Sequence, residues 1–241
     1  MKGGAAMIRT KDLTKSFDGF YALNGLSLQV EKGAVYGLIG PNGSGKTTLI
    51  KHLTGVMIPD SGSCEIAGMP VYDNIAVKEM TVCVPDELYF FGNYTLKDMR
   101  SFYKKIYTSW SDERYRTMLR DFGLNENGRI SRFSKGMQKQ AAFLLAESCR
   151  PDVMILDEPI DGLDPIMRKK VWGYLLADVA DRQMTVLISS HNLRELEGIC
   201  DCVGILSQGK LLFEGKLDEL KGKAKDMSLE ELFFYEMGGE Q

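Results

Sequence analysis

The chain has 241 residues, of which 44% are hydrophobic and 26% are charged. These ordinary globular proportions exclude a chain that is disordered throughout, and the length fits one large domain because a single core stays feasible up to roughly 250 residues. The formal net charge of −3 argues against a surface that coats a polyanion, so we expect no nucleic-acid partner.

The first thirty residues differ in pattern from the rest of the chain. In IRTKDLTKSF and FYALNGLSLQV apolar and polar residues alternate between turns, which predicts a small antiparallel sheet. Short, nearly continuous apolar runs then predict strands of a parallel sheet covered on both faces. These runs are VYGLI (35–39), VMIL (153–156), TVLI (185–188) and VGIL (203–206). Because helical patterns separate them, we predict an α/β fold with a mainly parallel sheet beside a small antiparallel one.

The stretch GPNGSGKTT follows the first of these strands and opens a helical segment. It matches G-x-x-x-x-G-K-[ST] in the strand, loop and helix context that confirms a P-loop. Glycines let backbone N–H groups curl around a phosphate, the helix N-terminus favours an anion, Lys46 adds a positive charge, and the Thr47 hydroxyl binds Mg²⁺. The alternative is a chance glycine-rich turn. We predict a nucleoside triphosphate site formed by Gly40, Pro41, Asn42, Gly43, Ser44, Gly45, Lys46, Thr47 and Thr48.

Helical patterns replace the strand patterns between about residues 94 and 150, which predicts a helical subdomain inserted into the sheet domain. One helix has Ser111 as its N-cap and Gly123 at its end. Its apolar face is predicted at Tyr115, Met118, Leu119 and Phe122. The tail reads as a solvated linker and a short final helix capped by Ser228, so we divide the chain into one domain over 7–220 and a tail over 221–241.

The run VMILDEP carries two carboxylates at the end of a predicted buried strand. Ligands of an open parallel sheet bind at the carboxyl ends of its strands. Asp157 is therefore placed to hold Mg²⁺, and Glu158 to deprotonate the attacking water as a general base. The alternative is a pair that is only solvated or caps a turn. Beside a P-loop, the pair predicts hydrolysis of the nucleotide.

Three further stretches share the order and spacing of one family: RFSKGMQKQ (132–140), LDEPIDGLDP (156–165) and SSHN (189–192). With the P-loop before them, the chain resembles the ATPase subunits of ABC transporters nearly from end to end. FSKGMQ matches the family signature, usually written LSGGQ. Ser134 and Gly136 are retained, whereas Phe133, Lys135 and Met137 stand in place of Leu, Gly and Gln.

The resemblance implies that the signature contacts an ATP held by a second ATPase subunit. Ser134 would donate its hydroxyl to the γ-phosphate, and the backbone at Gly136 would approach it closely. Each ATP would then lie between two chains, which form a homodimer or a heterodimer of related subunits. An N-cap turn that closes the helical subdomain is the alternative, and both roles are compatible.

The resemblance assigns three more residues. His191 matches the switch histidine, which contacts the γ-phosphate and holds the hydrolytic geometry, although a lone histidine at a strand end is also a common structural feature. Asp164 matches the loop that crosses the dimer interface, with capping of the next helix as its alternative. Phe17 takes the position that stacks on adenine, with core packing as its alternative. His52, by contrast, is interpreted as structural.

Asp86 departs from the family pattern. The family's Q-loop glutamine follows a strand, and TVCVPDELYF places Asp86 at this position. A carboxylate still binds Mg²⁺ through oxygen but donates no amide hydrogen bond, so the metal role is kept in our prediction. A turn residue after Pro85 is the alternative. The aromatic-rich residues 88–107 correspond to the region that docks the permease, with subdomain core as their alternative.

The implied function is an ATPase that uses ATP and Mg²⁺ and powers a separate membrane permease from the inner face of the cell membrane. The ending SLEELFFYEMGG is similar to that of subunits in the drug, antibiotic and antimicrobial-peptide exporter branch, which favours export. The alternative is a soluble ABC ATPase that acts on ribosomes or DNA, which the acidic balance and the single P-loop disfavour. Lys46, Asp157 and Glu158 argue against a third possibility, a non-enzymatic nucleotide sensor.

The cysteines and apolar runs agree with a cytoplasmic location. Five cysteines are an odd number, and none forms the CxxC pair of a zinc or thioredoxin-like site, so free thiols in a reducing compartment are expected. No apolar run approaches the about 18 residues of a membrane span, and the first residues lack the apolar stretch of a secretion signal.

Overall fold

A computed structural model describes residues 6–191 and 196–217. Its six-stranded sheet has the order β10-β9-β3-β8-β7-β6, and all neighbours in it except the β9–β10 pair are parallel. Every residue of β3, β7 and β8 is buried, as a parallel sheet covered on both faces requires. The predicted α/β core is confirmed. The strands are β3 (Val35–Ile39), β6 (Thr81–Val84), β7 (Val153–Asp157), β8 (Thr185–Ser190), β9 (Cys202–Ser207) and β10 (Lys210–Lys216).

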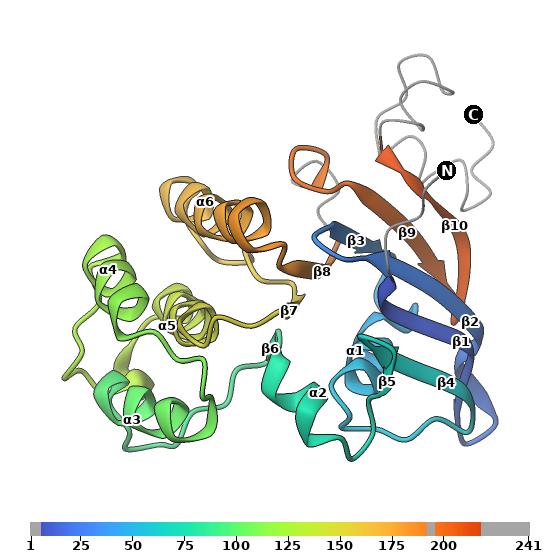
Figure 1. The fold of residues 1–241 in the computed structure, drawn as a ribbon, viewed down its shortest axis with the longest axis horizontal. Helices are drawn as coiled ribbons and strands as arrows, with labels where there is room; N and C mark the ends of the chain where they lie inside the picture. The colour runs from blue at the N-terminus through green and yellow to red at the C-terminus, as the bar shows by residue number, and fades with distance from the viewer. Residues whose placement is uncertain (1–5, 192–195, 218–241) are drawn as a thin grey trace.

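The predicted antiparallel sheet is also present, with four strands in the order β2-β1-β4-β5. It consists of β1 (Ala6–Phe17), β2 (Phe20–Glu31), β4 (Ser61–Ile66) and β5 (Met69–Pro70). The hairpin from β1 to β2 turns at Asp18 and Gly19, whose φ angles of 48° and 83° give the left-handed turn that suits twisted strands. This sheet lies beside β9 and β10 of the larger one (Figure 1).

The helices fall into two groups (Figure 1). α1 (Lys46–Leu53) and α2 (Ile75–Met80) lie on the side of the antiparallel sheet. The group at the opposite end is formed by α3 (Leu96–Ile106), α4 (Asp112–Phe122), the 3₁₀ turn Ile130–Arg132, and α5 (Lys135–Ser148), with α6 (Pro165–Arg182) beside them. The chain thus passes from the sheet into a helical region after β6 and returns to it at β7.

α4 shows how local sequence defines these helices. The Ser111 hydroxyl accepts a hydrogen bond from the Arg114 N–H, and Gly123 ends the helix with φ 66°. Tyr115, Met118 and Phe122 are buried, so the predicted apolar face is the packed one. Leu119, also predicted there, is partly buried against the same core.

The core is divided by the six-stranded sheet. Met154 and Leu156 of β7 join the cluster that contains the helices α4 and α5, whereas Val153 and Ile155 join the cluster beneath the antiparallel sheet. Successive side chains of a strand point to opposite faces, so one strand anchors both halves. Its last residue, Asp157, therefore has little freedom to move.

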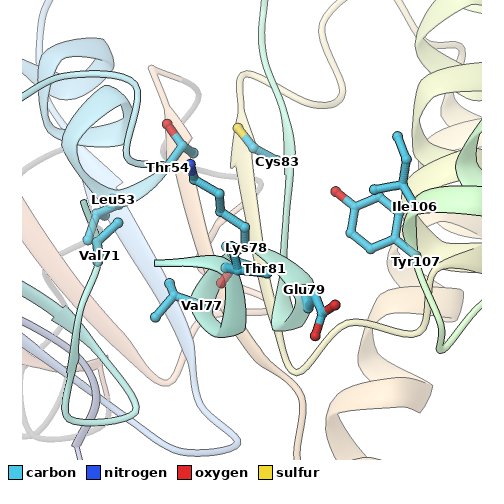
Figure 2. Close-up of a pocket in the computed structure, with 11 residues that line it drawn as sticks. Leu53, Thr54, Val71, Val77, Lys78, Glu79, Thr81, Cys83, Ile106 and Tyr107 are labelled. Carbon is cyan, nitrogen blue, oxygen red and sulfur yellow. The ribbon is translucent and has the colours of Figure 1, made fainter. Parts of the chain in front are cut away.

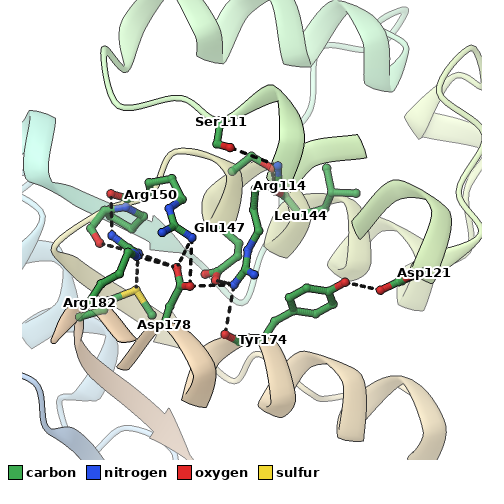
Figure 3. Close-up of polar contacts among 12 residues, drawn as sticks. Ser111, Arg114, Asp121, Leu144, Glu147, Arg150, Tyr174, Asp178 and Arg182 are labelled. Atoms are coloured by element: carbon green, nitrogen blue, oxygen red, sulfur yellow. Dashed lines mark hydrogen bonds and ion pairs between the residues drawn. The ribbon is translucent and has the colours of Figure 1, made fainter. Parts of the chain in front are cut away.

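A buried ionic cluster connects the helical end to α6 and to the start of β7 (Figure 3). Arg114 of α4 donates to Glu147 of α5 at 2.5 Å and to Asp178 of α6 at 3.0 Å. Arg150 and Arg182 also donate to Asp178, at 3.1 Å and 2.6 Å. The Glu147 side chain is fully buried and that of Asp178 is 4% exposed. Charged groups are tolerated in such a place only when they are paired.

The predicted linker and final helix of the tail lie outside the described residues. Within those residues, no helix combines the length and the apolar character that a membrane crossing needs.

Candidate active site

The P-loop lies between the end of β3 and the start of α1. The Lys46 ammonium donates to the carbonyl oxygens of Gly40 and Pro41, at 2.6 and 3.2 Å, so it is held inside the loop. Burial is the main cause that lowers the pKa of Lys46, and Glu158 and Asp157 oppose it. The Ser44 hydroxyl oxygen is buried and has no hydrogen-bond partner among the described residues. A phosphate oxygen would satisfy it, which fits a nucleotide in this loop.

Asp157 ends β7 close to the P-loop. Its Oδ2 accepts from the Thr47 hydroxyl at 3.2 Å, and its Oδ1 accepts from the Ser189 hydroxyl of β8. Asp157 is 4% exposed, and its carboxylate together with the Thr47 hydroxyl forms a set of hard oxygen donors that suits Mg²⁺. The sequence did not single out Ser189, although its position at the end of a buried strand is the same signal that identified Asp157.

Glu158 sits in a turn with an unusual backbone. Its φ is 46°, and its N–H donates to the Ser189 carbonyl oxygen at 3.2 Å. The His191 Nδ1 lies 2.9 Å from the Glu158 Oε2, and the backbone N–H of His191 donates to the same oxygen at 3.3 Å. This hydrogen bond to Glu158 is the main cause that raises the pKa of His191, against the opposing effect of burial. Glu158 and His191 are thus brought together.

One cavity of about 340 Å³ gathers most of the predicted residues. It is lined by Phe17, Phe20, Ala22, Asn42, Gly43, Ser44, Gly45, Lys46, Thr47, Thr48, Asp86, Asp157 and Glu158. A second cavity, of about 330 Å³, also has Asn42, Asp86 and Glu158 in its wall and adds Asp161 and His191. Phe17 lines the first cavity and is 44% exposed, which argues against the alternative that it packs in the core.

The signature residues lie elsewhere. Ser134 is the N-cap of α5 and accepts from the Met137 N–H at 3.2 Å, while Asp164 caps α6 through Ile166 and Met167 at 3.0 Å. A side chain added at Gly136 would lie 2.9 Å from the Gly162 carbonyl oxygen, so the glycine permits close packing. None of Ser134, Gly136 and Asp164 lines the P-loop cavity of this chain. The capping alternatives are therefore observed, and contact with a second subunit is compatible with them.

His52 has the structural environment that was expected. It is buried, its Nδ1 lies 2.7 Å from the Thr48 carbonyl oxygen, and burial is the main cause that lowers its pKa. Lys139 is a residue that the prediction missed, although it lies within RFSKGMQKQ. Its ammonium contacts both Asp86 and the backbone of Glu158.

A parallel sheet that carries a P-loop and two carboxylates around one cavity defines the class of P-loop nucleotide-binding proteins. Comparison with known proteins gives the family. The family model described as ABC transporter matches residues 23–161, which is more than half of the 241 residues. The chain therefore belongs to the ABC transporter family, in which it is an ATP-binding and ATP-hydrolysing subunit.

Individual relatives support this assignment. The chain is 33% identical over 215 residues to the ABC transporter ATP-binding protein YtrB of Bacillus subtilis (strain 168), covering 89% of this chain and 74% of YtrB. It is 35% identical over 225 residues to the bacitracin transport ATP-binding protein BcrA of Bacillus licheniformis, covering 90% and 72%. The chain spans only 39% of a longer relative, the probable multidrug ABC transporter ATP-binding protein YbhF of Escherichia coli (strain K12). A solved ATP-binding subunit of an ABC transporter matches with a TM-score of 0.88 and 28% identity, covering 96% and 99%.

Gly45 of the P-loop has no room for a side chain. Gly45 has φ 113°, and a Cβ there would collide with the Ala22 carbonyl oxygen, whereas Gly43 has φ 79° and open space around it. We expect Gly45→Ala to weaken ATP binding at least about tenfold more than Gly43→Ala. Both substitutions strain the backbone, but only a Cβ at Gly45 forces the loop to shift. Equilibrium titration with ATP measures this, and equal losses would show that the collision is harmless.

Proposed function

We propose that this subunit powers a separate membrane permease by ATP hydrolysis, and that transport runs outward. The observation that carries the ATPase chemistry is the single cavity that joins the P-loop with Asp157 and Glu158. Support for export comes from the similarity to BcrA, a bacitracin transport protein, and from the ending SLEELFFYEMGG. The proposed location is the inner face of the cell membrane, where the permease holds the subunit.

The proposed roles follow from the geometry around the cavity. Thr47 and Asp157 would hold Mg²⁺ with Asp86 as a third oxygen donor, and Lys46 would neutralise phosphate charge. Bound Mg²⁺ supplies charge neutralisation at the phosphates. Glu158 takes a proton from the attacking water, and its hydrogen bond with His191 fixes the direction of its carboxylate.

The proposed active unit is a dimer. Ser134, Gly136 and Asp164 do not line the cavity of their own chain, so a role toward ATP requires a second copy or a related subunit. The N-terminus of α5, capped by Ser134, presents backbone N–H groups that favour a phosphate. ATP between two subunits then favours the closed dimer by its higher affinity for that state.

The proposed docking surface for the permease is a cavity of about 480 Å³ between the sheet domain and the helical end (Figure 2). Ile106 and Tyr107 at the end of α3 face Lys78 and Cys83 across it (Figure 2). Ile75 is 74% exposed and Ile106 48%, and they leave apolar surface in contact with water. An apolar cytoplasmic segment of a permease fits this surface. The remaining wall is formed by Leu53, Thr54, Val71, Val77, Glu79 and Thr81.

Affinity capture from detergent-solubilised membranes of the native host tests the proposal. We expect a polytopic permease to be recovered with the unchanged subunit, and its recovery to fall at least about tenfold when Ile75→Asp and Ile106→Asp are combined. The matched control is Leu212→Asp, which changes a 43% exposed leucine on β10. Recovery with ribosomes or DNA-repair factors and without a permease would contradict the transporter proposal.

A further inference from the structure

Lys139 of α5 contacts two residues that line the active-site cavities. Its ammonium donates to the Glu158 carbonyl oxygen at 2.7 Å and to the Asp86 Oδ1 at 3.1 Å. The Lys139 side chain is 12% exposed, whereas that of Asp86 is 53% exposed. Most of the lysine is therefore buried between two segments that are far apart in the sequence.

The contact with Glu158 occurs where the backbone is strained. With φ at 46°, Glu158 lies in the left-handed region, which is unfavourable for a residue with a side chain. On one side the turn is fixed by the N–H of Glu158 bonded to Ser189. On the other side the carbonyl oxygen accepts from Lys139, and a hydrogen bond from a charged donor is stronger than a neutral one.

We propose that Lys139 is a positioning residue for ATP hydrolysis, which holds the backbone of Glu158 and the carboxylate of Asp86 in fixed places relative to α5. This inference rests on the proposed role of Glu158 as the general base. Ser134 caps the same helix five positions before Lys139. A helix moves as a rigid unit over this distance. A shift of α5 where it contacts the second subunit's ATP would therefore displace Glu158 through its hydrogen bond with Lys139.

The test is Lys139→Met, which keeps the apolar stem and removes the ammonium. We expect kcat to fall by about tenfold to a hundredfold, because a misplaced catalytic group loses rate even when it is still present. The KM for ATP should stay within about threefold, since Lys139 does not line the P-loop cavity. Lys139→Arg keeps the charge and the donors and should recover kcat to within about threefold of the unchanged protein.

Hydrogen exchange in the nucleotide-free protein tests the positioning role of Lys139 independently of ATP turnover. In the nucleotide-free protein, hydrogen exchange of the backbone around Glu158 should be faster in Lys139→Met than in the unchanged protein. The matched control is Lys170→Met, which removes a lysine of α6 that also donates to a backbone carbonyl oxygen, that of Asp121. Lys170→Met should change neither hydrogen exchange at Glu158 nor kcat.

The outcomes distinguish this inference from the proposed function. Unchanged kcat and unchanged hydrogen exchange in Lys139→Met, together with loss of turnover in Glu158→Gln, would overturn the positioning role and leave the proposed ATPase chemistry standing. Turnover that survives in Glu158→Gln would overturn the proposed chemistry itself. A Lys139→Met protein that unfolds at a lower temperature, with a raised KM and no recovery in Lys139→Arg, would show a general packing role and overturn the inference.

Discussion

Glu158→Gln is expected to lower the ATP turnover number by about 10²–10⁴-fold, the usual contribution of a general base. Glutamine has nearly the same size and can still hydrogen-bond His191, but its amide does not take a proton from water. The P-loop contacts of Lys46 and the Thr47–Asp157 pair are not altered by this change. The affinity for ATP should therefore stay within about threefold, as equilibrium binding measured beside steady-state hydrolysis will show.

The same variant should accumulate as a dimer at saturating Mg²⁺ and ATP. ATP that binds the closed dimer more tightly shifts the population toward it, and without hydrolysis nothing resets the equilibrium. Light scattering with and without nucleotide measures this shift. The matched control is Glu113→Gln, which changes an exposed glutamate in the first turn of α4. Monomers at saturating nucleotide, or turnover close to that of the control, would count against Glu158 as the base.

The parts of the fold that the sequence predicts are those set by local pattern. The run VYGLI is apolar at every position, and it forms the fully buried strand β3 beside the P-loop. The turn between β1 and β2 and the ends of α4 follow from residues within a few positions of each other. The P-loop is recognisable for the same reason, because its function needs a continuous backbone loop.

The contacts that the sequence does not predict join distant segments. Asp86 and Lys139 are 53 positions apart, and no local pattern indicates that they pair. The sequence allows Asp86 to be either a metal ligand or a turn residue, and neither interpretation includes its ion pair with Lys139. Ser134 is observed as a helix cap, and its contact with a second subunit is a proposal; the pattern in one chain cannot separate the two roles.

The ionic cluster between α4, α5 and α6 is another such case. Glu147 lies within an apolar helical run, where its charge suggests a position exposed to solvent. Its side chain is nevertheless fully buried. Its burial is tolerated because Arg114 of α4, thirty-three positions earlier in the chain, forms an ion pair with it. This cluster fixes α4 and α5 to α6, so it determines how firmly the helical end is attached.

At pH 8, Arg114→Met is expected to destabilise the protein by about 3–5 kcal/mol, because it leaves the ionised Glu147 as a buried charge without its partner. Asp178 keeps Arg150 and Arg182, so most of the loss arises at Glu147. In a chain of this size, each kcal/mol shifts the unfolding temperature by about 2–4 °C, which gives a drop of roughly 6–20 °C. Thermal unfolding without nucleotide measures it.

The pH dependence of the stability loss in Arg114→Met identifies the side chain that causes this loss. Burial, followed by the charge of Asp178, raises the pKa of Glu147 from its ordinary 4.5 to about 7. The folded state then keeps a proton that the unfolded state has already lost between these pH values, so stability falls as pH rises through this window. Removing Arg114, which opposes this shift, should therefore cost more stability at pH 8 than at pH 5. Adding Glu147→Gln to Arg114→Met should recover stability at pH 8 and little at pH 5, and a loss that is equal at both pH values would exclude Glu147 as its cause.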